Sequence, residues 1–306
     1  MATQAIDLPK LIERFGSEDK CHAYLEELRW PDGLRCPRCD SAKISRIKAR
    51  RQFDCDGCRY QFSVRVGTLF HDSKLPLWKW FLAVYMISES KKGVSANQLH
   101  RMLGVSYKTA WYLCHRIRSA MQEEGSELLT GIVEADETYI GGKLSGFATK
   151  RDAARGRLDN KTVVLGAIQR GGQLRVRVAP DAKHDTIHEF LGDVVHDKAE
   201  AIYTDSHRSY RGIADENTRH EYVDHSRGEY VRGNVHTNYV ESAWSLFDRA
   251  VLGSYHKLSS KHLQAYLDEF AFRFNNRNNP FLFRDTILKL VEGDALTFQE
   301  LVHPSA

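Results

Sequence analysis

Four cysteines with metal-ligand spacing are the first residues in this sequence that could do chemistry. Two residues separate Cys36 from Cys39, two separate Cys55 from Cys58, and fifteen lie between the pairs. Two such knuckles bring four thiolates to a tetrahedral site that suits Zn²⁺. Because four sulfurs leave no open coordination position, we expect one structural Zn²⁺ ion. Two disulfides are the alternative, but they would need an oxidising compartment that no other feature of the sequence indicates.

A second set of candidate ligands is acidic and begins in GIVEADETYIGGK, residues 131–143. In a strand the side chains alternate, so Glu134 and Asp136 share one face and Glu137 lies on the other. Aspartate is disfavoured in strands and adjacent acids repel one another, so this stretch costs stability unless a cation offsets it. The pattern indicates metal coordination by Asp136. A register shift of one residue would put Glu137 in its place.

The elements after this strand predict a sheet that could gather further acids. Residues 161–180 predict two strands joined at Gly171 and Gly172, and residues 184–196 predict a helix. A short apolar strand then ends on Asp205. Strand ends at the mouth of a mixed sheet are where α/β folds place chemistry. Asp205 could instead cap a helix that follows it.

Residues 236–253 predict a helix with one apolar face and with Glu241 in its first turn. Three strands, a helix, a fourth strand and this late helix, with acids at Asp136, Asp205 and Glu241, form the layout of a ribonuclease-H-like fold. Asn238 and Glu241 also match a capping box, in which Glu241 would only satisfy backbone donors. The pattern leaves both roles of Glu241 open.

Between residues 75 and 121 the apolar period is helical. Pro76 suits a first helical turn, Ser95 suits the N-cap of a helix that Gly104 ends, and Ser106 suits the N-cap of the next. A helix, a short turn with glycine and a basic helix predict a helix-turn-helix module whose second helix would enter the major groove. Two packed helices of an ordinary bundle give a similar pattern.

Four motifs carry a resemblance to a known family. They are ADETYIGGK (135–143), YTDSHRSY (203–210), HTNYVESAWSLFDR (236–249) and YLDEFAFRFNNR (266–277). With the cysteines, they resemble zinc-ribbon insertion-sequence transposases of the Merlin-related, ISXO2-like group, over roughly residues 30 to 280. The resemblance implies a DNA transposase with a DDE-type, ribonuclease-H-like catalytic domain. Such an enzyme binds the terminal inverted repeats of its element and catalyses metal-dependent phosphodiester hydrolysis and strand transfer.

The resemblance also implies catalytic roles. Asp136 would bridge two Mg²⁺ or Mn²⁺ ions, with Asp205 and Glu241 as flanking ligands, because paired divalent ions stabilise both the attacking and the leaving oxygen. Some relatives use an asparagine, here Asn238, as the third ligand, but a carboxylate holds Mg²⁺ better than an amide. Many relatives carry a lysine where this sequence has Asp248. That departure supports the alternative of a catalytically inactive DNA-binding regulator derived from a transposase.

The charge balance is mildly basic, with a net charge of +4 and a pI near 8.6, which agrees with an anionic partner. The implied partner is double-stranded DNA, both transposon ends and target. The expected DNA contacts are basic residues of the ribbon hairpin, the helix-turn-helix, the loop after the acidic strand and the region after Glu241: Lys43, Arg46, Lys48, Arg50, Arg51, Lys108, Arg116, Lys143, Lys150, Arg151, Arg155, Arg157, Arg249 and Lys257. Two ends must be cut and joined together, so we expect a homodimer or higher oligomer.

The predicted fold class is multidomain α+β. The expected domains are an N-terminal helical segment (1–30), a zinc ribbon (31–70), a helix-turn-helix DNA-binding module (71–125), a ribonuclease-H-like mixed α/β catalytic domain (126–280) and a C-terminal helix and tail (281–306). No apolar run reaches the roughly 20 residues of a membrane span, and the first residues lack the apolar core of a signal peptide. We therefore expect a cytoplasmic bacterial protein, without a membrane partner, that joins the nucleoid when bound to DNA.

Overall fold

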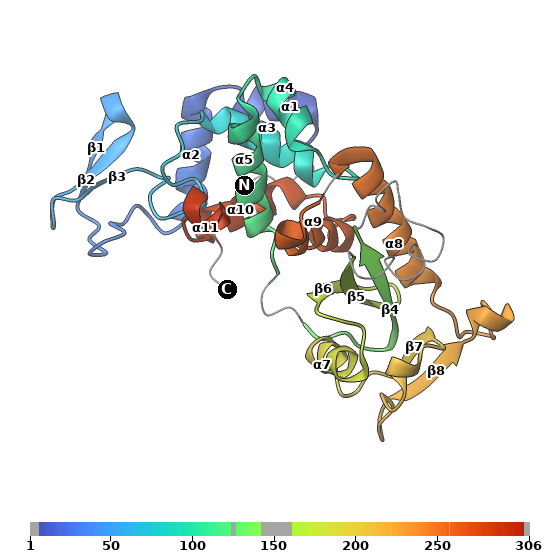
Figure 1. Ribbon diagram of the computed structural model, residues 1–306. Coiled ribbons are helices and arrows are strands. Elements are labelled where there is room, and N and C mark those ends of the chain that lie inside the picture. Colours follow the sequence, from blue (N-terminus) through green and yellow to red (C-terminus); the bar gives the residue numbers. More distant parts are fainter. Residues whose placement is uncertain (1–5, 124–126, 142–160, 257, 303–306) are drawn as a thin grey trace. The chain divides into compact units, whose positions relative to one another are not determined.

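The computed structural model of the chain describes residues 6–123, 127–141, 161–256 and 258–302. Its contacts divide it into two units, whose elements are labelled in Figure 1. The N-terminal unit comprises Met1–Met121 together with Asn278–Ala306, and the sheet unit comprises Gln122–Arg277. The C-terminal segment, predicted as a separate domain, therefore belongs with the N-terminal elements.

A small antiparallel sheet forms the ribbon of the N-terminal unit. Its strands, in spatial order, are β1 (Ile44–Ile47), β2 (Gln52–Cys55) and β3 (Gln61–Phe62). Phe53 and Phe62 are buried together with Cys36 and Cys55, and the Trp30 ring packs edge-on against Phe53. So few apolar side chains make a marginal core, which a bound metal ion would stabilise.

Seven α-helices make up most of the rest of the described N-terminal unit. They are α1 (Leu8–Phe15), α2 (Glu18–Arg29), α3 (Leu77–Ser88), α4 (Ala96–Leu103), α5 (Tyr107–Ala120), α10 (Leu282–Glu292) and α11 (Phe298–Val302). The predicted N-caps are confirmed, because Ser95 Oγ accepts the Gln98 N–H and Ser106 Oγ accepts the Thr109 N–H. Gly104 ends α4 at φ +59°, a left-handed conformation that favours glycine. None of the described helices has the length and apolar character needed to cross a bilayer.

Two helices occupy the C-terminal segment, where one was predicted. α10 packs against α3, and the hydroxyls of Ser88 and Thr286 lie 3.3 Å apart in that buried contact. Gly293 ends α10, and α11 follows. Between these helices the Leu296 carbonyl accepts hydrogen bonds from Tyr112 and Arg116 of α5. The C-terminal segment thus covers part of the α5 surface.

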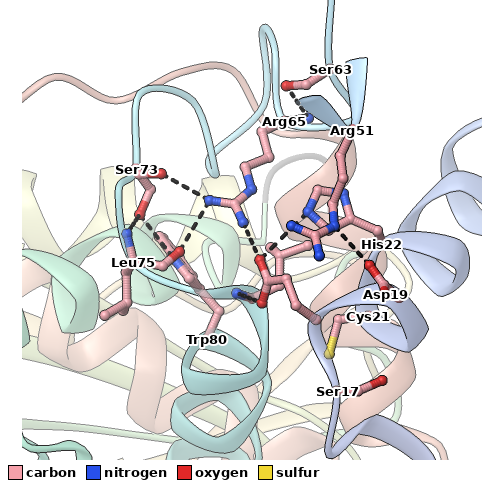
Figure 2. A network of polar contacts seen from close by, with 12 residues as sticks. Ser17, Asp19, Cys21, His22, Arg51, Ser63, Arg65, Ser73, Leu75 and Trp80 are labelled. Atoms are coloured by element: carbon pink, nitrogen blue, oxygen red, sulfur yellow. Dashed lines mark hydrogen bonds and ion pairs between the residues drawn. The ribbon is translucent and has the colours of Figure 1, made fainter. Parts of the chain in front are cut away.

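A partly buried polar network joins the end of the ribbon to α2 and α3 (Figure 2). The Arg65 guanidinium donates to the carbonyls of Ser73 and Leu75 and to the Glu18 carboxylate, at 2.6 to 3.0 Å. Glu18 also accepts the N–H of Leu77, the first residue of α3. Because these partners come from separate elements, the network fixes the connection between the ribbon and α3.

A five-stranded mixed sheet is the core of the sheet unit. In spatial order its strands are β6 (Leu174–Ala179), β5 (Thr162–Gln169), β4 (Ile132–Ile140), β7 (Ala201–Asp205) and β8 (Arg219–Val223). β4, in the centre, pairs antiparallel with β5 and parallel with β7, and β8 adds a further parallel strand (Figure 1). β8 was not predicted, because its sequence RHEYV is mostly polar and only Val223 is buried.

Helices cover both faces of this sheet. α7 (His184–Val194) packs on the face that bears Val133 and Ala135. α8 (Asn238–Ala250) and α9 (Leu263–Asn275) pack on the opposite face, which bears Ile140. Because side chains alternate along β4, Glu134 and Asp136 lie on the α8 face. The predicted mixed α/β architecture is confirmed.

Candidate metal centres and DNA interface

The four predicted zinc ligands converge in the ribbon. Their Sγ atoms all lie within 4.8 Å of one another, with 3.7 Å between Cys36 and Cys58 and 3.5 Å between Cys39 and Cys55. Zn–S bonds of about 2.3 Å in a tetrahedron place the sulfurs about 3.8 Å apart. All four are free cysteines, and the Arg38 N–H points at the Cys36 sulfur. This geometry fits a closed, structural Zn²⁺ site.

The basic residues of the ribbon hairpin lie on the surface of the N-terminal unit. All five predicted DNA contacts there are exposed: Lys43, Arg46, Lys48, Arg50 and Arg51. Arg46 pairs with Glu26 and Arg51 pairs with Asp19, each at 2.7 Å, and Figure 2 shows the second pair. Exposed ion pairs contribute only about 0–1 kcal/mol, so a DNA phosphate could replace either acid.

Asp136 lies on β4, and Asp205 ends the neighbouring strand β7. Glu134 is the last residue of β4 paired with β7, opposite Tyr203, and the same register continued by two residues would bring Asp136 beside Asp205. Asp205 Oδ1 accepts the His207 N–H at 2.8 Å, which closes a turn after the strand. The short 3-10 helix that follows has no side-chain cap. Asp205 therefore does not act as the helix cap that was considered as an alternative.

Glu137 lies on the opposite face of the sheet from Asp136. Its Oε2 accepts the hydroxyl proton of the buried Tyr210 at 2.8 Å, and the neighbouring strand pairs Asp136 with Gly166. The structure thus has the unshifted register, in which Asp136 and not Glu137 faces α8.

Glu241 lies in the first turn of α8 but not in a capping box. The N-cap is Thr237 and not Asn238, and the Thr237 hydroxyl donates to Glu241 Oε1 at 2.6 Å. His225 Nε2 lies 3.7 Å from the same oxygen. Asn238 is exposed as the first residue of the helix. The capping-box alternative for Glu241 is therefore wrong.

Asp136 occupies an environment that disfavours its negative charge. Burial, followed by the charges of Glu137, Asp205 and Glu241, raises the pKa of Asp136 to about 8. Among the described residues, the four cysteines form the one group of His, Cys, Asp and Glu side chains gathered closely enough to hold a metal ion, and the three acids do not form such a group. Hard oxygen donors in an environment that disfavours negative charge fit a divalent cation such as Mg²⁺.

The raised pKa predicts a pH dependence for the stability of metal-free protein. Unfolded Asp136 loses its proton near pH 4, whereas the folded residue keeps it up to about pH 8. Between these values the folded state binds one more proton, so the free energy of unfolding falls as pH rises, by at most about 1.4 kcal/mol per pH unit from this group. Thermal melts of zinc-loaded protein without added Mg²⁺ or Mn²⁺, between pH 5 and 8, should show this fall, and Asp136→Asn should flatten it. Equal slopes in the two proteins would assign the effect to another group.

Trp244 holds Asp136 in place and Gly166 leaves room for the indole, although neither residue had been predicted as part of the site. The indole N–H of Trp244 on α8 donates to Asp136 Oδ2 at 3.1 Å. A Cβ on Gly166 would lie only 2.4 Å from the Trp244 ring, so a larger residue would push the indole away. An isolated glycine inside a strand indicates such a close approach, and it was the one available signal.

The predicted contacts on α5 lie in different environments. Lys108 is exposed in the first turn, with its ammonium 4.5 Å from the Phe298 ring. Arg116 is only 4% exposed, and its guanidinium donates to the carbonyls of Leu296 and His71. Because these donors are used inside the unit, the structure corrects the prediction that Arg116 contacts DNA.

The remaining predicted DNA contacts are on or near α8 and in the loop after β4. Arg249 is exposed and donates to Ser245 Oγ at 2.6 Å. The others lie outside the described residues: Lys143, Lys150, Arg151, Arg155, Arg157 and Lys257.

A cysteine ribbon combined with a mixed sheet, whose central strands and covering helix carry acids, fits the class of zinc-ribbon DDE transposases. Comparison with known proteins agrees: residues 128–275 match the ISXO2-like transposase domain, and residues 16–61 match the transposase zinc-ribbon domain. Over 278 residues the chain is 34% identical to the "uncharacterized protein in transposable element ISH50" of Halobacterium salinarum, covering 86% of this chain and 92% of that protein. The chain belongs to the ISXO2-like transposase family, as its motifs predicted.

One solved structure with a weak likeness is the simian T-cell lymphotropic virus intasome in complex with the PP2A regulatory subunit B56 gamma. The match covers 69% of this chain and 71% of that chain, at 12% identity and a TM-score of 0.23. A likeness of this size supports no argument about fold or function.

Proposed function

We propose that the chain is an active DNA transposase. It binds the terminal inverted repeats of its element, hydrolyses a phosphodiester bond to expose a 3′-OH, and joins that hydroxyl to target DNA. The observation that supports the proposal is the effect of Asp205 and Glu241, whose charges, after burial and Glu137, raise the pKa of Asp136. The parallel pairing of β4 with β7 agrees, because its register, if continued two residues beyond Glu134 and Tyr203, would bring Asp136 beside Asp205. The strand order β6-β5-β4-β7-β8, with its two parallel pairs, supports a ribonuclease-H-like catalytic domain.

The side chains of the sheet unit would perform distinct tasks in this reaction. Asp136, Asp205 and Glu241 hold Mg²⁺ or Mn²⁺, two ions per site, which when bound stabilise charge on the attacking and leaving oxygens. Trp244 fixes the Asp136 carboxylate through its indole N–H, and Thr237 fixes Glu241 through its hydroxyl. Hydrolysis and joining are both phosphoryl transfers between oxygens, so one site can serve both.

The N-terminal unit would find the DNA ends. The ribbon hairpin offers its exposed cations to the phosphate backbone, and α4 with α5 would act as a helix-turn-helix. In such modules the N-terminal residues of the second helix contact base edges. Tyr107 is 51% exposed and Lys108 and Thr109 are exposed beside it, whereas the second half of α5 is buried except at Ser119. At least two copies of the chain would act together, because two transposon ends must be joined. The reaction would take place in the cytoplasm.

The third metal ligand can be identified by two substitutions. We expect Glu241→Gln to lower the rate of Mg²⁺-dependent nicking by about 100-fold or more, because it removes a charge that acts on Asp136. Asn238→Ala should cost less than about tenfold, because Asn238 is exposed and uncharged. Nicking rates under single-turnover conditions measure both. A larger loss for Asn238→Ala would make the asparagine the third ligand.

An inactive DNA-binding regulator is the second candidate, favoured by Asp248 at the position where many relatives carry lysine. Partial burial raises the pKa of Asp248 and the nearby charge of Lys161 opposes the rise, so a cation does lie near this position. The candidates are distinguished by incubating zinc-loaded protein and labelled terminal-repeat DNA with or without Mg²⁺. Nicking only when Mg²⁺ is present supports the enzyme, whereas specific binding without nicking in either condition supports the regulator.

A further inference from the structure

A buried ionic cluster lies directly beside the proposed metal site. Glu134 precedes Asp136 by two residues on β4, faces the same side of the sheet and is 0% exposed. Its Oε1 accepts from Arg170 Nε at 2.8 Å and lies 3.1 Å from His236 Nδ1. Burying a charge costs free energy unless it is paired and hydrogen-bonded, so the cluster calls for a physical reason.

The second oxygen of Glu134 holds the start of α8. Oε2 accepts the backbone N–H of Tyr239 at 2.7 Å and that of Val240 at 3.3 Å. The first N–H groups of a helix lack partners inside the helix and form the positive end of its dipole, which favours a carboxylate there. Thr237, the N-cap residue, makes no side-chain cap hydrogen bond. Glu134 therefore caps α8 from a strand of the sheet.

Arg170 holds Glu134 in this orientation. The residue follows β5, and its backbone N–H donates to the Ile132 carbonyl. Its guanidinium also donates to the His236 carbonyl at 3.2 Å and lies 4.9 Å from the centre of the Tyr203 ring. One guanidinium thus joins β4, β7 and the segment that precedes α8.

α8 is attached to β4 at two points, one on each side of Glu241. Before Glu241, the N–H groups of Tyr239 and Val240 bond to Glu134, and after it the Trp244 indole bonds to Asp136. A single attachment would let the helix pivot about that point. Two attachments to neighbouring positions on one rigid strand fix both the rotation and the height of α8.

We propose that Glu134 is a positioning residue, which caps α8 from the strand that carries Asp136 and so sets the separation of Glu241 from Asp136. This inference rests on the proposed function, in which both acids bind the same divalent cations. Loss of the cap should free the first turn of α8 and weaken cation binding.

Glu134→Gln in the full chain tests this role, with Mn²⁺ alone as the probe. Manganese binding is measured by electron paramagnetic resonance, and amide exchange is followed at Tyr239 and Val240. We expect Mn²⁺ affinity to fall by about tenfold, the scale seen when the groups behind metal ligands are removed. Exchange protection should be lost in the first turn of α8 but kept in its last turn.

Glu269→Gln is the matched control, because it breaks another buried ion pair of the same unit. Glu269 is 0% exposed and accepts from Arg273 Nε at 3.2 Å on α9. This variant should keep both the Mn²⁺ affinity and the protection of the first turn of α8. If Glu134→Gln and Glu269→Gln weaken Mn²⁺ binding equally, Glu134 contributes only to general stability and the proposal is overturned. A Mn²⁺ affinity of Glu134→Gln within about twofold of that of the unsubstituted chain would also overturn it.

Two further comparisons keep the test decisive. If Glu134→Gln does not fold, Arg170→Lys replaces it, because lysine keeps a cation beside Glu134 but cannot also reach His236. Arg170→Lys should lower Mn²⁺ affinity and exchange protection in the first turn of α8, both by less than Glu134→Gln would. Unchanged Mn²⁺ affinity contradicts the proposal. Asp136→Asn and Glu241→Gln are measured alongside. If neither Asp136→Asn nor Glu241→Gln weakens Mn²⁺ binding, the proposed metal site itself is wrong. If both weaken Mn²⁺ binding but Glu134→Gln does not, only the positioning role of Glu134 is refuted.

Discussion

Asp136→Asn is expected to abolish metal-dependent cleavage while leaving DNA binding in place. The single-turnover rate of nicking at a terminal repeat should fall by about a thousandfold or more, which corresponds to about 4 kcal/mol of transition-state stabilisation. The substitution removes the charge of the proposed ligand but keeps its volume, and the amide oxygen can still accept the Trp244 indole proton. A gel-shift titration with the same DNA end measures binding separately.

The fold should tolerate this substitution well. At pH 8 and without added Mg²⁺ or Mn²⁺, the charge on Asp136 is disfavoured by burial and by neighbouring acids, so a neutral amide should leave the melting temperature of the zinc-loaded protein equal or higher. Asp193→Asn is a suitable control, because Asp193 lies on α7 with its side chain 53% exposed and pairs with Arg177. Unfolding of Asp136→Asn would show that the aspartate is structural, and undiminished nicking would remove it from the site.

The features that could be predicted from the sequence are those with short-range causes. Ser95 and Ser106 cap helices through N–H groups three residues away, and Gly171 closes a hairpin between adjacent strands. The paired cysteines also carry their geometry in their spacing, since each knuckle needs only a few residues of backbone. The strand of Asp136 was predictable because alternation along it depends on no other element.

The features that could not be predicted depend on partners far along the chain. Glu134 was noticed only as a source of repulsion, because its cap donors lie 105 and 106 residues away on α8. Arg116 matched a basic helix face, but a carbonyl 180 residues downstream covers its guanidinium. Helical periodicity shows which residues share a face and not whether another segment packs on it.

Cys55→Ser is expected to release zinc and unfold the ribbon while sparing the sheet unit. Binding of structural Zn²⁺ contributes about 10–16 kcal/mol to small domains, far more than the few apolar side chains around Phe53 and Phe62 can supply. Native mass spectrometry should show loss of one zinc ion, and limited proteolysis should cut within the ribbon before the sheet unit. Cys21→Ser is the control: Cys21 is also buried, but its thiol donates to the Phe15 carbonyl, which serine can still do. A Cys55→Ser protein that keeps one zinc ion would refute the four-cysteine site.

The same variant separates the two proposed roles of the molecule, since the ribbon and the acids belong to different units. If the ribbon cations bind phosphates, its affinity for DNA ends should fall and the salt dependence of binding should become less steep, by about 0.9 in log–log slope for each phosphate that is no longer neutralised. Arg46 and Arg51 already pair with acids of α2, so their share of that change should be smaller than that of Lys43 or Lys48. Mn²⁺ binding by the sheet unit should not change. Unaltered end affinity and salt slope after zinc loss would mean that the ribbon binds a protein partner, and that end recognition rests on the first turn of α5.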